Sequence, residues 1–191
     1  MDETHRKPRS DALKNRARLI EAAKEVLGRG GPEASLEAVA REAGVGIGTL
    51  YRHFPTREAL FQAVYRHDVE DLLRLAEALD RPGGGVAALR EWMHANVALV
   101  GTKRGLLGAL AVVVGDDSKA MYSELSARIL RAVDGLLQRA IAEGEVRADV
   151  SAEDLTQTFY ALCYARPPEP GWEVQVRRLL DIFIDGLRRR H

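Results

Sequence analysis

The chain has 191 residues, of which 46% are hydrophobic and 29% charged, and its 28 Lys and Arg residues balance 28 Asp and Glu residues. This composition excludes a disordered or fibrous chain and predicts one or two globular domains. The net charge of zero excludes a general polycation, although residues 1–67 carry 12 basic against 9 acidic side chains. The single cysteine, Cys163, excludes an internal disulfide and a cysteine-based metal site, so we expect a reducing compartment, the cytoplasm.

Neither export nor membrane insertion is indicated. The first residues lack the apolar stretch of a secretory signal. The best apolar run, Leu106 to Val114, is far shorter than the roughly 18 residues that cross a bilayer. We therefore expect no membrane partner.

Apolar residues recur at helical spacing along almost the whole chain. A first helix, ended by the glycines and proline of residues 28–32, is predicted by the stripe Leu13, Ala17, Ile20, Ala23 and Leu27. Ser35 is the expected N-cap of a short second helix. A third short helix is expected from about Gly46 to Phe54, with Leu50 and Phe54 facing inward. A fourth follows Pro55 and Thr56 and runs to about Leu79.

Two segments rich in glycine and proline, 81–85 and 166–171, separate the remaining elements. Between them we expect amphipathic segments at about 86–100, 104–114 and 118–143. Helices at 152–165 and 172–188 complete the chain. Because no strand pattern and no repeat is found, the sequence predicts an all-α fold.

Residues 35–54 combine two short amphipathic helices with a turn at Ala43-Gly44-Val45, which is what a helix-turn-helix requires. Gly46 and Gly48 cost helix propensity but remove bulk where a helix must approach DNA closely. The outward positions of the second helix are short, hydroxylated or basic, unlike the Glu and Lys of a solvated face. They are Ile47, Gly48, Thr49, Tyr51, Arg52 and His53.

Residues 13–65 resemble the DNA-binding domain of TetR-type transcriptional regulators, most specifically at 45–60, VGIGTLYRHFPTREAL. The resemblance implies a homodimer that reads a palindromic double-stranded DNA operator, and a carboxy-terminal helical domain that binds a small-molecule effector. The expected domains are 1–56, a three-helix helix-turn-helix domain with a basic arm, and 57–191, joined to it by the long helix, for ligand binding and dimerisation.

The resemblance also assigns DNA-contacting roles. Ile47, Gly48, Thr49 and Arg52 would face the groove. Tyr51 and His53 would bind phosphates, and Arg57 stands where the family usually has Lys. Ser35 is included among the expected DNA-binding residues. Gly46 replaces a frequent Ser, so a side-chain phosphate contact is not expected there.

The segment from Arg6 to Lys24 carries seven basic and two acidic residues. A basic arm ahead of a helix-turn-helix can add phosphate contacts that do not depend on sequence. A solvated tail is the alternative, and the sequence leaves both open for residues 6–9.

The carboxy-terminal half resembles the family less specifically, although residues 144–154 look like the junction before its two final helices. The resemblance implies that these helices form a four-helix dimer interface. The expected interface residues are Leu155, Phe159, Leu162, Leu179, Leu180, Phe183, Ile184 and Leu187. The apolar stripe of the last helix is equally compatible with packing inside its own subunit, across a dyad, or both.

Candidates for the effector pocket combine apolar walls with a few polar groups. They are Trp92, Met93, Asn96, Leu110, Tyr122, Phe159 and Cys163, and each taken alone is more often a core residue. No cofactor and no metal site is expected.

An enzyme is not predicted, because no nucleophile elbow, metal spacing or phosphate loop is present. Gly44, Gly46 and Gly48 begin a dinucleotide fingerprint, but Thr49 occupies the place of its third glycine and no strand precedes it. A helix-turn-helix that contacts a protein instead of DNA remains the alternative. The basic residues favour DNA. The resemblance then implies a ligand-responsive repressor, since repression is the commoner role in this family.

Overall fold

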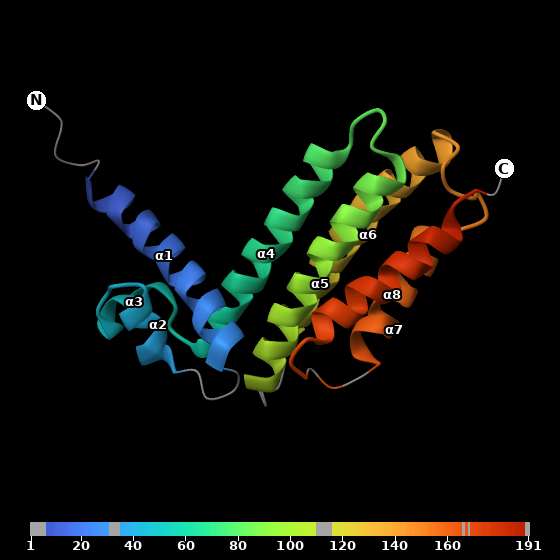
Figure 1. Ribbon diagram of the computed structural model, residues 1–191. Coiled ribbons are helices and arrows are strands. Elements are labelled where there is room, and N and C mark those ends of the chain that lie inside the picture. The colour runs from blue at the N-terminus through green and yellow to red at the C-terminus, as the bar shows by residue number, and fades with distance from the viewer. Residues whose placement is uncertain (1–6, 31–34, 110–115, 166, 168, 190–191) are drawn as a thin grey trace, which may run out of the picture. The chain divides into compact units, whose positions relative to one another are not determined.

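The computed structural model describes residues 7–30, 35–109, 116–165, 167 and 169–189. In these ranges the chain is helical apart from turns and one isolated bridge between Val146 and Arg188, which confirms the all-α prediction (Figure 1). The helices are α1 (Lys7–Gly30), α2 (Leu36–Glu42), α3 (Ile47–His53), α4 (Arg57–Leu79), α5 (Gly85–Ala109), α6 (Asp116–Ala142), α7 (Ala152–Tyr164) and α8 (Trp172–Leu187).

The chain divides into two compact units, and two helices are shared between them. The first unit holds the described residues up to His67 together with α5 from Thr102 onward. The second holds Asp68–Gly101 and the described residues from α6 to the carboxy end. Hence α4 and α5 each run from one unit into the other. The expected domain boundary between residues 56 and 57 lies at the start of α4 and stays a prediction.

In the first unit, two hydroxyl side chains begin helices as expected. Ser35 accepts a hydrogen bond from the backbone N–H of Ala38 at 3.1 Å and caps α2. Thr56 accepts one from the N–H of Ala59 at 3.0 Å at the start of α4. Such caps supply partners for N–H groups that have none inside the helix.

The expected first helix is present as α1, but its apolar stripe is only partly buried. Leu13 is 68% exposed, and Ala17 is exposed as well. The buried residues of α1 begin at Leu19, followed by Ile20 and Ala23. The apolar stripe of α1 is therefore buried only where other elements of the unit pack against it, and the turns of α1 before Leu19 are not buried in this way.

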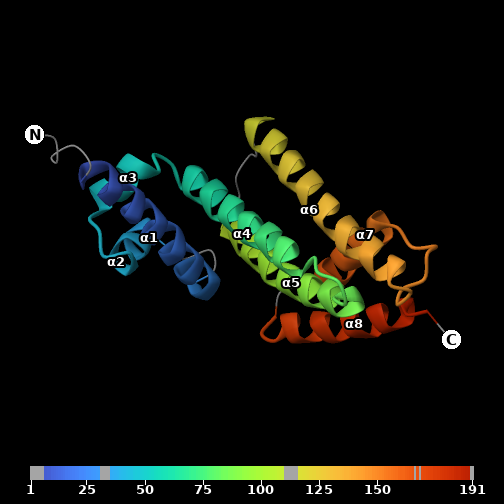
Figure 2. The same ribbon diagram turned by 90° about the horizontal axis from the view of Figure 1, so that it is seen from above.

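The second unit is a helical core in which α7 packs against both α6 and α8. Figure 2 shows α5 running alongside α4. The indole Nε1 of Trp92 on α5 donates to the carbonyl oxygen of Leu72 on α4 at 2.9 Å, both within this unit. The largest fully buried side chains of this unit are Leu89, Trp92, Met93, Leu125, Leu136, Leu137 and Phe159.

The expected division of residues 86–114 into two helices is wrong, because α5 continues through Gly101 to Ala109. Gly101 does not end the helix; its lack of a side chain allows Glu173 and Trp172 to approach α5 closely. A Cβ there would lie 3.0 Å from Oε1 of Glu173 and 3.4 Å from the ring of Trp172. The remainder of the expected segment, residues 110–114, lies outside the described residues.

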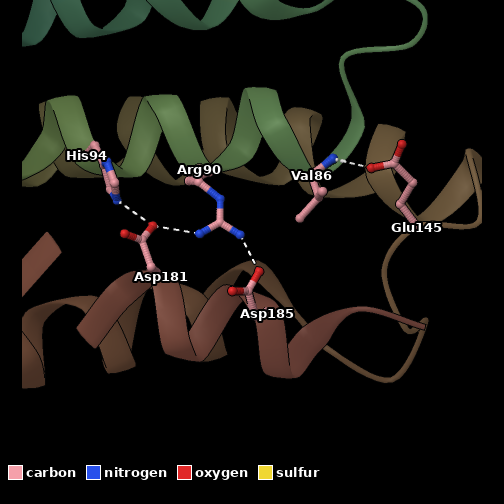
Figure 3. Close-up of polar contacts among 6 residues, drawn as sticks. All are labelled: Val86, Arg90, His94, Glu145, Asp181 and Asp185. Carbon is pink, nitrogen blue, oxygen red and sulfur yellow. Dashed lines mark hydrogen bonds and ion pairs between the residues drawn. The ribbon is translucent and has the colours of Figure 1, made fainter. Parts of the chain in front are cut away.

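The start of α5 is fixed by a carboxylate from the turn after α6. The backbone N–H of Val86 donates to Oε2 of Glu145 at 2.8 Å, as Figure 3 shows. Gly85 has φ +38°, and a Cβ there would lie within 3 Å of that carboxyl group. The glycine therefore allows an acidic side chain to reach the positive end of α5.

Candidate nucleic-acid interface

α2 and α3 are joined by a tight turn that contains a left-handed glycine. Gly44 has φ +63°, and the N–H of Val45 donates to the carbonyl oxygen of Ala40 at 3.0 Å. Leu50 and Phe54 are 0% and 2% exposed, facing inward as expected. Because these two side chains fix one side of α3, the opposite side is held outward.

All six outward candidates of α3 have accessible surface. Ile47 and Tyr51 are 38% and 46% exposed, although large apolar or aromatic side chains are usually covered. Gly48 and Arg52 are exposed, while Thr49 and His53 are half-buried. In addition, Nη2 of Arg52 donates to Oγ1 of Thr49 at 2.9 Å. The surface combines hydroxyl groups, basic groups and accessible apolar area.

The fold itself does not require glycine at positions 46 and 48. Neither residue has a positive φ, and a Cβ built on either would meet no atom within 4 Å. Gly46 is the N-cap of α3, a position that favours glycine over alanine. Gly48 lies inside the helix, where glycine costs about 0.5–1 kcal/mol relative to alanine. The cost at Gly48 is not offset by any close contact within the chain, which is consistent with close approach by something outside it.

Several arginines surround the helix-turn-helix. The guanidinium of Arg16 lies 5.2 Å from the centre of the Phe54 ring, and that of Arg57 lies 5.3 Å from the centre of the Phe61 ring. Arg18 lies against Gly44, where a Cβ would be 2.6 Å from its Nη2. Arginine stacked on a ring keeps its charge and its N–H groups for a second partner. Of the expected arm, residues 1–6 lie outside the described residues.

The candidates for an effector pocket lie mostly in the core of the second unit. Trp92, Met93, Asn96, Phe159 and Cys163 are at most 4% exposed. Oδ1 of Asn96 has no hydrogen-bond partner among the described residues. Their role in a pocket stays a prediction.

The other two candidates add little to this picture. Tyr122 is half-buried on α6, and Leu110 lies outside the described residues. A surface cavity of about 300 Å³ between α7 and α8 includes Cys163 but none of the other candidates.

The expected interface residues on α7 and α8 fall into two groups. Five are buried within their own subunit, namely Leu155, Phe159, Leu180, Ile184 and Leu187. Leu162 and Phe183 are half-buried, and Leu179 is 45% exposed.

Two exposed apolar residues of α8 were not expected from the sequence, namely Val174, which is 70% exposed, and Ile182, which is 61% exposed. They lie beside the apolar stripe from which the inner face of α8 was expected. Apolar residues on a second face of the helix are the sequence signal that indicates them.

A charged cluster joins α5 to α8 and was not found from the sequence (Figure 3). Nη1 of Arg90 is 2.6 Å from Oδ1 of Asp181, and Nη2 of Arg90 bonds Asp185. Nε2 of His94 lies 2.9 Å from the same Asp181 oxygen. Burial alone would raise the pKa of Asp181, but the bond from Arg90 and the charges of His94 and Arg90 lower it below its ordinary value.

In the part of the chain that the structure describes, no helix is long and apolar enough to cross a membrane. The same part contains no group of three or more His, Cys, Asp or Glu side chains suited to hold a metal ion.

The sequence matches two family models and the fold matches solved structures. Residues 19–64 match the bacterial regulatory proteins of the tetR family, and residues 85–189 match the SbtR-like transcriptional regulator carboxy-terminal domain. The TetR regulator SCO0520 from Streptomyces coelicolor is 35% identical, over 92% of this chain and 99% of that chain, with a TM-score of 0.77. A TetR regulatory protein from Mycobacterium vanbaalenii is 32% identical, over 95% and 99%, with a TM-score of 0.74.

A curated relative supports the same family. The HTH-type transcriptional repressor BepR from Brucella suis biovar 1 (strain 1330) is 28% identical over 173 residues, which is 82% of this chain and 80% of that protein. Both halves of the chain thus match models of one family, and two solved structures above 30% identity span nearly its full length. The chain belongs to the TetR family of DNA-binding transcriptional regulators, which are not enzymes.

Proposed function

We propose that this regulator is a repressor that binds a palindromic operator as a homodimer and is released by a small molecule. The observation that carries the DNA-reading part is the glycine at position 48. It lies in the first turn of the exposed helix α3, and neither its φ nor a close contact within the chain requires glycine there. The absence of a side chain there allows the start of α3 to approach a DNA surface closely.

Within this proposal, the residues of α3 divide by chemistry. Ile47, Gly48, Thr49 and Arg52 face base edges, since an arginine can bond both O6 and N7 of guanine and an apolar group can contact a thymine methyl. Phosphates would be bound by Ser35, Tyr51, His53 and Arg57. Arg57 is the first residue of α4, so a phosphate beside it would also meet the N–H groups of a helix start.

Dimerisation is proposed through α7 and α8. Leu179 and Ile182 expose apolar area on α8, and the cavity between the two helices lies beside them. A symmetric dimer would place two α3 helices about 34 to 36 Å apart, one turn of DNA. Repression as the sign of regulation is supported by the similarity to BepR, which is a transcriptional repressor.

The effector is proposed to bind in the second unit, against the buried face of α5 that carries Trp92, Met93 and Asn96. α4 and α5 continue from that unit into the first. A ligand that binds one pose of these helices better than another shifts the population of that pose. Coupling of about 1–3 kcal/mol is typical of such linked sites.

The test is selection of bound sequences from a random duplex pool at about 0.15 M salt, where loose electrostatic binding is suppressed. We expect a palindromic consensus. A folded, dimeric protein that enriches no sequence, in the presence or absence of cell-extract small molecules, would overturn the operator-binding proposal and favour a protein partner for the helix-turn-helix.

A further inference from the structure

Arg52 differs from Arg16 in how it is held. Arg16 lies over the ring of Phe54, a contact that fixes distance more than direction. The guanidinium of Arg52 instead donates from Nη2 to the Thr49 hydroxyl at 2.9 Å. Among the described residues, no carboxylate pairs with Arg52. Its direction is therefore set by one directional bond within the recognition helix.

The spacing of the two residues makes this bond possible. Residues three apart in a helix are neighbours on its surface. Leu50, which lies between Thr49 and Arg52 in the sequence, is buried and holds α3 against the rest of the domain. The side chains of Thr49 and Arg52 therefore lie on the accessible side of α3. The bond uses one of five guanidinium N–H groups, and the remaining four stay available for an acceptor pair such as O6 and N7 of guanine.

Holding Arg52 before DNA arrives has a thermodynamic consequence. A free arginine side chain loses much rotamer entropy when it is fixed on a base. A side chain that is already oriented loses less rotamer entropy on binding. This strengthens binding only to a base whose acceptors match the fixed orientation of the guanidinium. Because Thr49 accepts the bond from Arg52, its own hydroxyl proton also remains available to a base or a phosphate.

We propose that Thr49 is a positioning residue for base recognition: its hydroxyl accepts the bond that orients the Arg52 guanidinium, and Arg52 reads one guanine. This inference rests on the proposed DNA-reading function of α3. It assigns Thr49 an effect on specificity that acts through Arg52, in place of an independent contact.

The experiment uses the full-length protein and the consensus duplex that wild type selects. Affinity is measured for that duplex and for duplexes with each base pair replaced in turn. The variants are Arg52→Ala, Thr49→Val, Thr49→Ser and the double variant Thr49→Val with Arg52→Ala. Thr156→Val is the matched control, since it also removes a hydroxyl that bonds within its own helix, at 2.7 Å to Ala152. Circular dichroism melting confirms that each variant is folded.

Arg52→Ala identifies the base pair that Arg52 reads, as the one where discrimination of about tenfold or more disappears. We expect Thr49→Val to reduce discrimination at that same pair to about twofold, while Thr49→Ser and Thr156→Val retain it. In the Arg52→Ala background, Thr49→Val should cause no further loss of discrimination at that pair.

Three results would overturn the inference. Thr49→Val could keep full discrimination, Arg52→Ala could lose none at any pair, or Thr49→Val could weaken all duplexes equally in both backgrounds, as a phosphate contact would. A wild-type protein with no consensus sequence would instead defeat the proposed function, and the inference with it. The two failures are thus distinguishable.

Discussion

Arg90 on α5 donates a hydrogen bond to Asp181 on α8, with 2.6 Å between Nη1 and Oδ1. The same guanidinium reaches Asp185, one helical turn further along α8 (Figure 3). One arginine of α5 therefore bonds two carboxylates on successive turns of α8, which would otherwise repel each other. Lysine, as a point charge, could not make this forked contact.

We expect Arg90→Gln to destabilise the fold, because it removes the counter-charge of Asp185 and leaves Asp181 with His94 alone. The side chains of Arg90 and Asp181 are 26% and 39% exposed, so solvent screening limits the loss to about 1 kcal/mol. Urea unfolding measures it. Arg74→Gln, which breaks the more exposed pair with Asp71 within α4, should change the unfolding free energy by less than half as much. Equal losses would contradict this role of Arg90.

Asp181 should also make stability depend on pH. Its pKa in the folded chain lies below the ordinary value of 3.8, so the ionised group stabilises the fold. That contribution is complete above the ordinary value and is lost as the pH falls from there through the lower folded-state pKa. We expect wild type to be more stable than Asp181→Asn at about pH 6, and the difference to shrink toward about pH 3.

The same comparison in an Arg90→Gln background provides the control. The bond from Arg90 is a major cause of the lowered pKa of Asp181, so the difference at about pH 6 should be smaller there. A difference between wild type and Asp181→Asn that stays constant across this pH range would show that the carboxylate contributes nothing through ionisation.

The local parts of this fold could be predicted from the sequence. Ser35 and Thr56 were expected at helix starts, and Leu50 and Phe54 were expected to face inward, as the structure shows. Each of these features depends on signals within a few residues, such as a hydroxyl before an apolar stripe. The surface of α3 followed because its anchors were known.

The parts that failed depend on distant residues. Gly101 was expected to lie between two helices, yet it is inside α5. Its lack of a side chain makes room for Glu173 and Trp172, which are far away in the sequence, and no local pattern shows that approach. Leu13 continues the apolar stripe of α1 but is exposed, and the spacing of apolar residues alone does not show which part of a stripe is buried. The pairing of Arg90 with Asp181 likewise requires knowledge of which helices meet.

Ile182 tests the proposed dimer. It is 61% exposed on α8, and burial of such a side chain in a partner contributes about 1.5–3 kcal/mol. In a symmetric dimer Ile182→Glu removes two such contacts and buries two charges, so we expect the dissociation constant to rise by about 100-fold or more. Sedimentation equilibrium measures it.

Leu13→Glu is the matched control for Ile182→Glu. Leu13 is 68% exposed on α1, in the other unit, and its substitution should leave the dimer intact. Dissociation by Leu13→Glu with an unaffected Ile182→Glu dimer would move the interface away from α8.

Gly48 gives the sharpest separation between stability and DNA binding. A Cβ at this position meets nothing within 4 Å in the free protein, and the residue lies inside α3. Gly48→Ala should therefore raise the unfolding free energy by about 0.5–1 kcal/mol through helix propensity. The added methyl group would occupy space that the DNA surface needs, so we expect affinity for the selected operator to fall by about tenfold or more.

Gly135→Ala supplies the control that makes this result specific. Gly135 is also an interior helical glycine, in α6, and a Cβ there likewise meets nothing within 4 Å. It should gain the same stability in thermal or urea unfolding and bind the operator as wild type does. Gly46 is less suitable, because it is the N-cap of α3, where alanine is itself unfavourable. If Gly48→Ala gained stability and kept full operator affinity, the close approach of DNA to the start of α3 would be wrong, since the glycine would then serve neither the fold nor the binding.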